Sequence, residues 1–143
     1  MKRAIVILLA VAVGGFVLIQ FIPYGHQHDN PPIVKEPNWD SAQTKEIAQR
    51  ACFDCHSNEI DWPWYSYVAP VSWLIQHDAE EGRQHLNFSD WDRMRYPDEI
   101  IEVVDRGEMP PAQYLLMHPE ARLTQQEKDQ FISGIQATIS NSN

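Results

Sequence analysis

The chain has 143 residues, of which 43% are hydrophobic and 22% are charged, and this is the composition of an ordinary folded protein with room for one domain and an appendage. Its formal net charge is −9 at pH 7, and without the N-terminal Lys2 and Arg3 the remaining 20 acidic and 9 basic groups give −11. Such a surface argues against nucleic acid and anionic lipid head groups as partners. It favours a partner protein with a basic docking patch, although solubility alone explains the charge equally well.

The first predicted element is a membrane anchor. Lys2 and Arg3 precede a nearly continuous apolar run from Ala4 to Ile22, which is nineteen residues long. At about 1.5 Å per residue a helix of this length spans about 28 Å, enough to cross a bilayer. Because basic flanks stay in the cytoplasm, we expect residues 1–23 to form a single-pass helix in the inner (cytoplasmic) membrane. The rest of the chain then faces the periplasm or the cell exterior.

A cleaved signal peptide is the alternative interpretation of this N-terminus. Ala12-Val13-Gly14 is a weak candidate for the small-residue cleavage site. The apolar run continues past it through Phe16–Ile19, which favours an uncleaved anchor. Both interpretations export the remainder of the chain.

Residues 24–38 are predicted to be a linker. They are rich in Pro, Asn, His and charged residues, and the prolines prevent a regular helix. His26 and His28 are two positions apart and can bind a metal at that spacing, but a solvated linker is the simpler interpretation. We therefore expect an extended tether that leads to a domain over residues 39–143.

The domain is expected to begin with an amphipathic helix. Asp40 and Gln43 resemble a capping pair. Apolar and small residues then recur at helical spacing, at Ile47, Ala48, Ala51, Cys52 and Cys55. This pattern predicts one helix that carries both cysteines at its C-terminal end.

Cys52-Phe53-Asp54-Cys55-His56 is a C-x-x-C-H motif, the attachment signature of a c-type haem. Two thiols three positions apart can form thioethers with the two vinyl groups of one porphyrin, and the adjacent imidazole can reach the iron. The second ring nitrogen of such a histidine normally donates to a backbone carbonyl, for which Pro63 and Pro70 are candidates. The motif predicts one covalent haem c on Cys52 and Cys55, with His56 as the proximal iron ligand.

Three other uses of the two cysteines remain as alternatives, namely a disulfide in an oxidising compartment, half of a zinc site and a thioredoxin-like redox pair. Zinc needs two further ligands at matching spacing, and the chain contains only these 2 cysteines. A thioredoxin-like pair follows a strand in a βαβ pattern, which the sequence lacks. Haem is therefore the favoured prediction.

The segment after the motif, residues 57–73, is rich in aromatic side chains. A wall of Trp and Tyr around the macrocycle would exclude water and raise the reduction potential. An ordinary aromatic core is the alternative.

Five segments together resemble the bacterial haem-binding domain family, which has cytochrome c character. They are Cys52-Phe-Asp-Cys-His-Ser-Asn-Glu, Trp62-Pro-Trp-Tyr, Ala69-Pro-Val-Ser-Trp-Leu, Glu81-Gly-Arg and Leu86-Asn-Phe-Ser-Asp-Trp91. The resemblance covers about residues 30–139 and is more specific than C-x-x-C-H alone. It implies an exported domain that binds haem covalently, and it brings no defined physiological reaction.

A second helix is expected over residues 70–86, with Leu74, Ile75 and Ala79 facing inward. Arg83 on this helix is a candidate partner for a haem propionate, because guanidinium pairs with a carboxylate in a bidentate fork. A surface ion pair with Glu80 is the alternative role.

Two more helices are expected in the C-terminal third. One opens at Pro97-Asp98-Glu99, buries Ile100, Ile101, Val103 and Val104, and ends at Gly107. The other starts at a Thr124–Glu127 capping box and has Phe131, Ile132, Ile135 and Ile139 on one face. Gly134 within it suggests a close crossing over Ala48 or Ala51.

Met109 lies between these helices in Glu108-Met109-Pro110-Pro111, and we predict it as the distal iron ligand. A thioether on a proline-stiffened loop loses little conformational freedom on binding, and Met opposite His is common in electron-carrying cytochromes. The family resemblance supports the same residue, since Tyr114 and His118-Pro119 follow it. The competing ligands are Met94, Met117, His77, His85 and His118, and an open distal site is the remaining alternative.

The sequence as a whole predicts an all-α, small monohaem cytochrome c-like domain behind a transmembrane helix. Its expected function is single-electron transfer, and no side chain need act as an acid or base, so we expect a carrier rather than an enzyme. A haem-based sensor with an open distal site is one alternative. A peroxidase-like enzyme is another, and His77 or His85 would be its distal residue.

Overall fold

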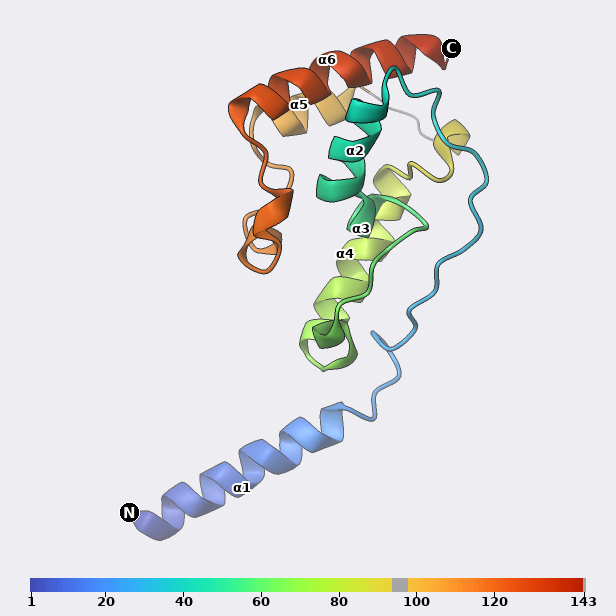
Figure 1. Ribbon diagram of the computed structural model, residues 1–143. Helices are drawn as coiled ribbons and strands as arrows, with labels where there is room; N and C mark the ends of the chain where they lie inside the picture. Colours follow the sequence, from blue (N-terminus) through green and yellow to red (C-terminus); the bar gives the residue numbers. More distant parts are fainter. Residues whose placement is uncertain (94–97, 143) are drawn as a thin grey trace. The chain divides into compact units, whose positions relative to one another are not determined.

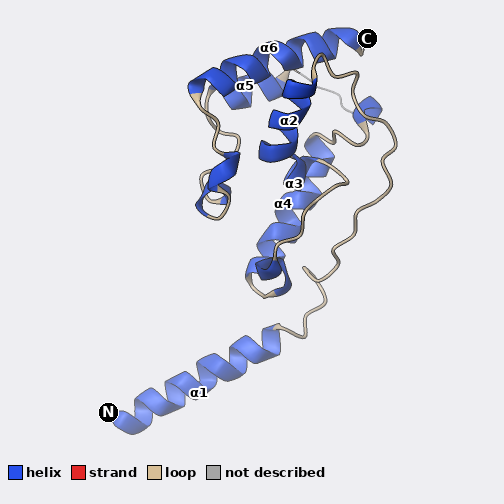
Figure 2. Ribbon diagram, in the orientation of Figure 1, coloured by secondary structure: helices blue, strands red, loops and turns tan. Residues whose placement is uncertain are grey.

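The computed structural model describes residues 1–93 and 98–142 and is drawn in Figure 1. Its α-helices are α1 (Lys2–Ile19), α2 (Ala42–Ala51), α3 (Phe53–His56), α4 (Val71–His85), α5 (Glu99–Asp105) and α6 (Gln125–Asn141). Its 3-10 helices are η1 (Trp64–Tyr67), η2 (Trp91–Arg93), η3 (Tyr114–Leu116) and η4 (Pro119–Ala121). Over the described residues no strand forms, as Figure 2 shows, and only an isolated bridge joins Lys35 and Asp90. The predicted all-α class is confirmed.

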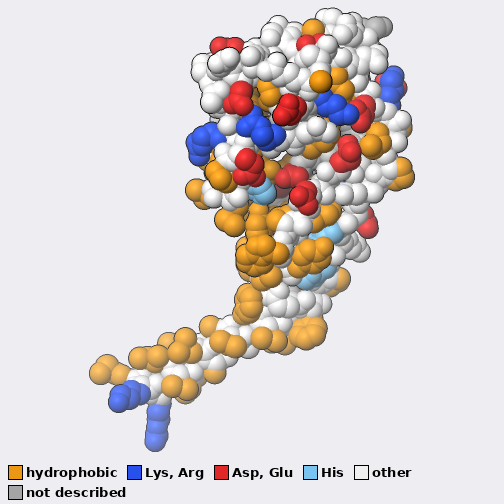
Figure 3. All heavy atoms as spheres, viewed as in Figure 1, with side chains coloured by type: hydrophobic (Ala, Val, Ile, Leu, Met, Phe, Trp, Pro, Cys, Tyr) orange, Lys and Arg blue, Asp and Glu red, His pale blue; other side chains and the backbone are white. Residues whose placement is uncertain are grey.

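α1 is apolar around its whole circumference, and none of its residues is buried. Figure 3 shows apolar side chains along its length and basic side chains at its N-terminal end. Its mean hydropathy is 2.3 over 18 residues, so by length and composition it can be a membrane span or a signal sequence. The helix stops at Ile19, three residues before the end of the apolar run.

The contacts within the chain group it into two compact units. The first unit contains Met1–Asp29 and Trp62–Glu80, and the second contains Asn30–Asp61 and Glu81–Asn143. These units combine segments that are far apart in the sequence, whereas the sequence predicts three consecutive parts, namely an anchor, a linker and a domain. That division stays a prediction.

In the first unit, the linker residue His28 packs against the aromatic segment. Its ring centroid lies 4.5 Å from that of Trp62 and 4.1 Å from that of Tyr67. Its Nε2 donates to the Ser66 carbonyl over 3.0 Å. The expectation of a solvated His28 is therefore wrong, because Trp62 and Tyr67, which follow the cysteine motif in the chain, pack against its ring.

The core of the second unit is formed by α2, α3, α5, α6 and the segment before η2. Phe88 stacks on Phe53 with a centroid distance of 5.4 Å and on Trp91 with 6.0 Å. In Figure 1, α6 lies along α5 and crosses the N-terminal end of α2, and both helices contact α6. The buried apolar residues are Ile47, Ala48, Ala51, Phe53, Phe88, Trp91, Ile100, Val104, Leu123, Phe131 and Ile135.

The cysteine helix differs from its prediction at both ends. Ser41, not Asp40, caps α2, and its hydroxyl accepts from the Thr44 N–H over 3.2 Å. Cys52 has φ −131°, which is not helical, so α2 ends at Ala51 and α3 is a separate turn. The prediction of one continuous helix is therefore wrong.

The other helices largely follow the sequence pattern. α5 ends before Gly107, which has φ +71°, and it buries Ile100 and Val104. Its predicted start at Pro97 lies outside the described residues. In α4, Ala79 is buried as predicted, but Leu74 is exposed, so its predicted inward orientation is wrong.

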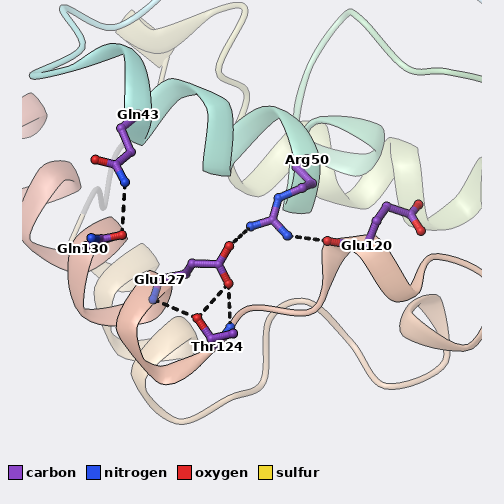
Figure 4. Close-up of polar contacts among 6 residues, drawn as sticks. All are labelled: Gln43, Arg50, Glu120, Thr124, Glu127 and Gln130. Carbon is purple, nitrogen blue, oxygen red and sulfur yellow. Dashed lines mark hydrogen bonds and ion pairs between the residues drawn. The ribbon is translucent and has the colours of Figure 1, made fainter.

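The predicted capping box at the start of α6 is present and is extended by a residue of α2, as Figure 4 shows. The Glu127 carboxylate accepts from the Thr124 N–H over 2.8 Å, and the Glu127 N–H donates back to the Thr124 hydroxyl over 3.2 Å. Arg50 donates to the same carboxylate and to the Glu120 carbonyl. These hydrogen bonds lower the pKa of Glu127, those from Thr124 most of all. Arg50 thus joins α2 to both η4 and α6.

Gly134 of α6 makes the predicted close approach to α2, but against Thr44 and not over Ala48 or Ala51. A Cβ on Gly134 would lie 2.1 Å from Thr44 Oγ1 and 2.9 Å from Thr44 Cγ2. Thr44 is buried and β-branched, so its side chain has little freedom to move away.

We expect Gly134→Ala to destabilise the protein by about 1–2 kcal/mol, because the overlap with Thr44 outweighs the gain in helix propensity. Urea unfolding measures the loss. In a Thr44→Ala background the same substitution is expected to be neutral or stabilising. An equal loss in both backgrounds would contradict this account of the crossing.

Candidate functional site

The candidate site is built on α3 and its N-cap residue Cys52, and this turn presents Cys52, Cys55 and His56. The His56 N–H donates to the Cys52 carbonyl over 2.9 Å and closes this turn. The two thiols are not joined by a disulfide. Desolvation, together with the nearby Cys55, raises the pKa of the Cys52 thiol to about 12, so Cys52 is a neutral thiol at neutral pH.

His56 is held by two backbone carbonyls of the second unit. Its Nδ1 lies 3.0 Å from the Gly82 oxygen and 3.2 Å from the Leu86 oxygen. A carbonyl can only accept, so Nδ1 carries the proton and Nε2 keeps its lone pair. Desolvation lowers the pKa of His56, although the two hydrogen bonds oppose the shift. His56 is therefore a neutral imidazole of fixed tautomer, which is the form that binds iron.

The predicted carbonyl partners of His56 were wrong. The Pro63 carbonyl accepts from the Ser66 N–H over 2.9 Å, and the Pro70 carbonyl accepts from the Trp73 N–H over 3.2 Å, so each begins a turn of its own. Gly82 provides the carbonyl because the backbone of α4 can approach α3 there. A Cβ on Gly82 would lie 2.3 Å from the Cys55 carbonyl oxygen.

Ser57 and Asn58, the two residues after His56, fasten this turn to the segment after α4. The Asn58 N–H donates to the Ser89 hydroxyl over 3.0 Å, and the Asn58 side-chain oxygen accepts from Asn87 over 2.9 Å. The Ser57 hydroxyl donates to the Phe53 carbonyl over 2.8 Å. Sequence reasoning assigned these residues no role, although the Ser-Asn and Asn-Phe-Ser segments were among those that resemble the family.

Arg83 holds the same turn from α4. Its Nε donates to the Ser57 carbonyl over 2.8 Å, and one Nη donates to the Asn30 side chain over 3.3 Å. The structure thus gives Arg83 a positioning role beside the cysteine motif. Its predicted pairing with a haem propionate stays a prediction.

The loop that carries Met109 is tied to the cysteine motif through Tyr114. The Tyr114 hydroxyl donates to Asp54 Oδ2 over 2.6 Å, and Asp54 lies between the two cysteines. Desolvation and this hydrogen bond raise the pKa of Tyr114, so the phenol remains a donor. Met109 itself lies on the surface, and its N–H donates to the Val103 carbonyl over 3.2 Å. Met109 and Tyr114 are five positions apart, so an extended chain of at most about 17 Å joins them.

The competing ligands lie on several different elements. Met117 is exposed, and the His118 ring stacks on Tyr114 with a centroid distance of 4.2 Å. His85, near the end of α4, is close enough to lower the pKa of His56, whereas His77 belongs to the first unit. Met94 lies outside the described residues. Met109 as the distal ligand stays a prediction.

The zinc alternative gains no support from the described part of the chain. Over residues 1–93 and 98–142, no three His, Cys, Asp or Glu side chains gather where they could hold a metal ion. The turn from Cys52 to His56 instead offers two thiols three positions apart and one neutral imidazole nitrogen. These residues fit a porphyrin iron better than a tetrahedral metal site.

Comparison with known proteins agrees with the chemistry of this site. No curated protein and no solved structure matches the chain. A family model described as a haem-binding domain matches residues 14–137, which include α2, α3, α4 and the Met109 loop. The chain therefore belongs to this family of haem-binding domains, and haem is its cofactor.

Proposed function

We propose that this haem-binding domain holds one haem covalently, through thioethers to Cys52 and Cys55. Each thiol adds its S–H bond across one vinyl group, with sulfur bonding to one carbon and hydrogen to the other. This addition needs no external oxidant or reductant. The spacing of the two thiols on one turn supports the proposal.

His56 is proposed as the proximal ligand, and its hydrogen bonding is the observation that carries the proposal. The His56 Nδ1–H donates to the Gly82 and Leu86 carbonyls over 3.0 and 3.2 Å, which leaves Nε2 as the ligating atom. Hydrogen bonds of this kind orient the ring and increase its basicity toward a metal. Met109 is proposed as the opposite ligand, presented by a loop that Tyr114 ties to Asp54.

The function that we propose is single-electron transfer. Bound haem supplies an iron that alternates between the ferrous and ferric states. His56 and Met109 would both hold the iron in each state, which would limit reorganisation. No side chain of the site is assigned an acid or base role, so the domain is proposed as a carrier and not as an enzyme.

We also propose that α1 remains as a single-pass anchor in the cytoplasmic membrane, with the haem domain on the periplasmic side. Lys2 and Arg3 at its N-terminal end favour this orientation. Beyond them the chain carries 20 acidic against 9 basic groups, so a redox partner with a basic docking patch is favoured.

Optical spectra of the haem-loaded protein test the role of Met109. We expect wild type to show a sulfur-to-iron charge-transfer band and to bind no carbon monoxide. Met109→Ala is expected to lose the band and to bind carbon monoxide, because a distal position then opens. Met117→Ala, which removes an exposed thioether from the same region, should leave both properties unchanged.

A wild type that binds carbon monoxide and does not respond to Met109→Ala would contradict this assignment. It would favour a haem-based sensor with an open distal site. Turnover of peroxide by that form would favour a peroxidase-like enzyme instead.

A further inference from the structure

The first unit has a group of large apolar side chains exposed to solvent on η1 and the start of α4. Trp64 is 76% exposed, Tyr67 55%, Val71 44% and Leu74 52%. We call these four residues the aromatic face. Single exposed apolar residues are ordinary, but four large ones exposed within eleven residues of one compact unit mark a candidate interaction surface.

The helical geometry groups these side chains into two pairs, one on η1 and one on α4. Side chains three positions apart in a 3-10 helix project in the same direction, so Trp64 and Tyr67 extend from the same side of η1. Val71 and Leu74 are likewise three positions apart and are neighbours on the surface of α4.

The end of α1 is fastened to the short connection between η1 and α4. Gln20, the residue directly after α1, donates from its side-chain nitrogen to the Ala69 carbonyl over 3.0 Å. Its side-chain oxygen accepts from the Ala69 N–H over 2.9 Å. One amide side chain thus satisfies both backbone groups of a residue that lies between Tyr67 and Val71.

Two further contacts hold the chain after α1 against α4. Gly25 has φ +84°, and a Cβ on it would lie 2.7 Å from the Ser72 carbonyl carbon, so the two backbones are in close contact. The Tyr24 hydroxyl donates to Glu80 over 3.2 Å. If α1 spans a membrane, the surface of that membrane must therefore lie close to the start of α4.

We propose that the aromatic face docks on the lipid bilayer interface at the point where α1 leaves the membrane. This inference rests on the proposed role of α1 as a retained anchor. Trp and Tyr favour the head-group region, because each has an apolar ring with one polar atom. The face would support the first unit on the membrane surface, in place of lining the haem as the sequence suggested.

The chemistry of the face predicts apolar docking on zwitterionic lipid. None of its four residues is charged, and the exported chain as a whole is acidic, with 20 acidic against 9 basic groups. Anionic head groups would repel such a chain, so the attraction must come from ring burial and should depend little on salt.

Quenching of tryptophan fluorescence by brominated lipid tests the proposal. Neither α1 nor the linker contains tryptophan, so the anchor itself cannot produce the signal. The full haem-loaded chain is placed in phosphatidylcholine vesicles brominated near the head group, near the chain ends, or not at all. We expect quenching by bromine near the head group to exceed quenching by bromine near the chain ends, and to persist in high salt.

Trp64→Phe is expected to lose most of this quenching, whereas Trp39→Phe in the second unit is expected to keep it. A carbonate wash of the vesicles tests the α1 anchor separately from the docking of the aromatic face. A chain that resists the wash but shows equal quenching in wild type and Trp64→Phe would overturn the docking alone. A chain released by the wash would overturn the anchor, and the docking with it.

Discussion

Removing both thiols, in Cys52→Ala/Cys55→Ala, is expected to abolish covalent haem attachment completely. The chain contains no other cysteine, so no other thiol can replace them. His56 and its carbonyl partners remain, so the variant is expected to bind haem reversibly through the imidazole alone. Acidic solvent extraction should then remove the haem from the variant and leave it on wild type. Haem staining of a denaturing gel gives the same comparison.

The two single variants serve as controls for each other. Cys52→Ala and Cys55→Ala each keep one thiol, so each is expected to retain haem on a denaturing gel, with an absorption spectrum between those of wild type and the double variant. Wild-type haem that extracts as readily as that of the double variant would disprove the thioethers while leaving haem binding intact.

Replacing Gly82 by alanine is expected to produce the second large effect. The new Cβ would lie 2.3 Å from the Cys55 carbonyl oxygen and 2.9 Å from the Cys55 carbonyl carbon, and backbone atoms cannot rotate away. α4 must therefore move from α3 and withdraw the Gly82 carbonyl from His56 Nδ1. We expect a loss of about 2–3 kcal/mol in the free energy of unfolding, measured in urea, despite the better helix propensity of alanine.

The same variant should also change the haem site. With one hydrogen bond to Nδ1 lost, we expect weaker binding by His56, visible as a changed visible spectrum and reduced haem occupancy. Gln84→Ala provides the matched control, since Gln84 is exposed on the same helix. Unchanged stability and spectrum in Gly82→Ala would mean that the approach of α4 to α3 does not position His56.

The sequence predicted the elements whose signals are local. The capping box at Thr124 and Glu127, the end of α5 before Gly107 and the apolar character of α1 are each written within a few adjacent residues. The C-x-x-C-H motif is equally local, and the haem-binding family that it suggested together with four further segments is confirmed.

The parts that the sequence did not reveal depend on residues far apart in the chain. The two carbonyl partners of His56 are 26 and 30 positions away, and nothing near the motif distinguishes Gly82 from Pro63 or Pro70. The Gly134 crossing was expected, but its partner Thr44 is set by the packing of α6 on α2. A glycine within a helix predicts a close approach of another element but does not identify that element.

The mass of the full-length protein under denaturing conditions tests the central claim most directly. The protein is produced with its N-terminal segment in a bacterial host that exports it and attaches haem. We expect the mass of the chain plus one haem, and no reaction of Cys52 or Cys55 with a thiol-alkylating reagent. A chain of unmodified mass with two alkylatable thiols would contradict covalent attachment and leave a haem held by ligation alone.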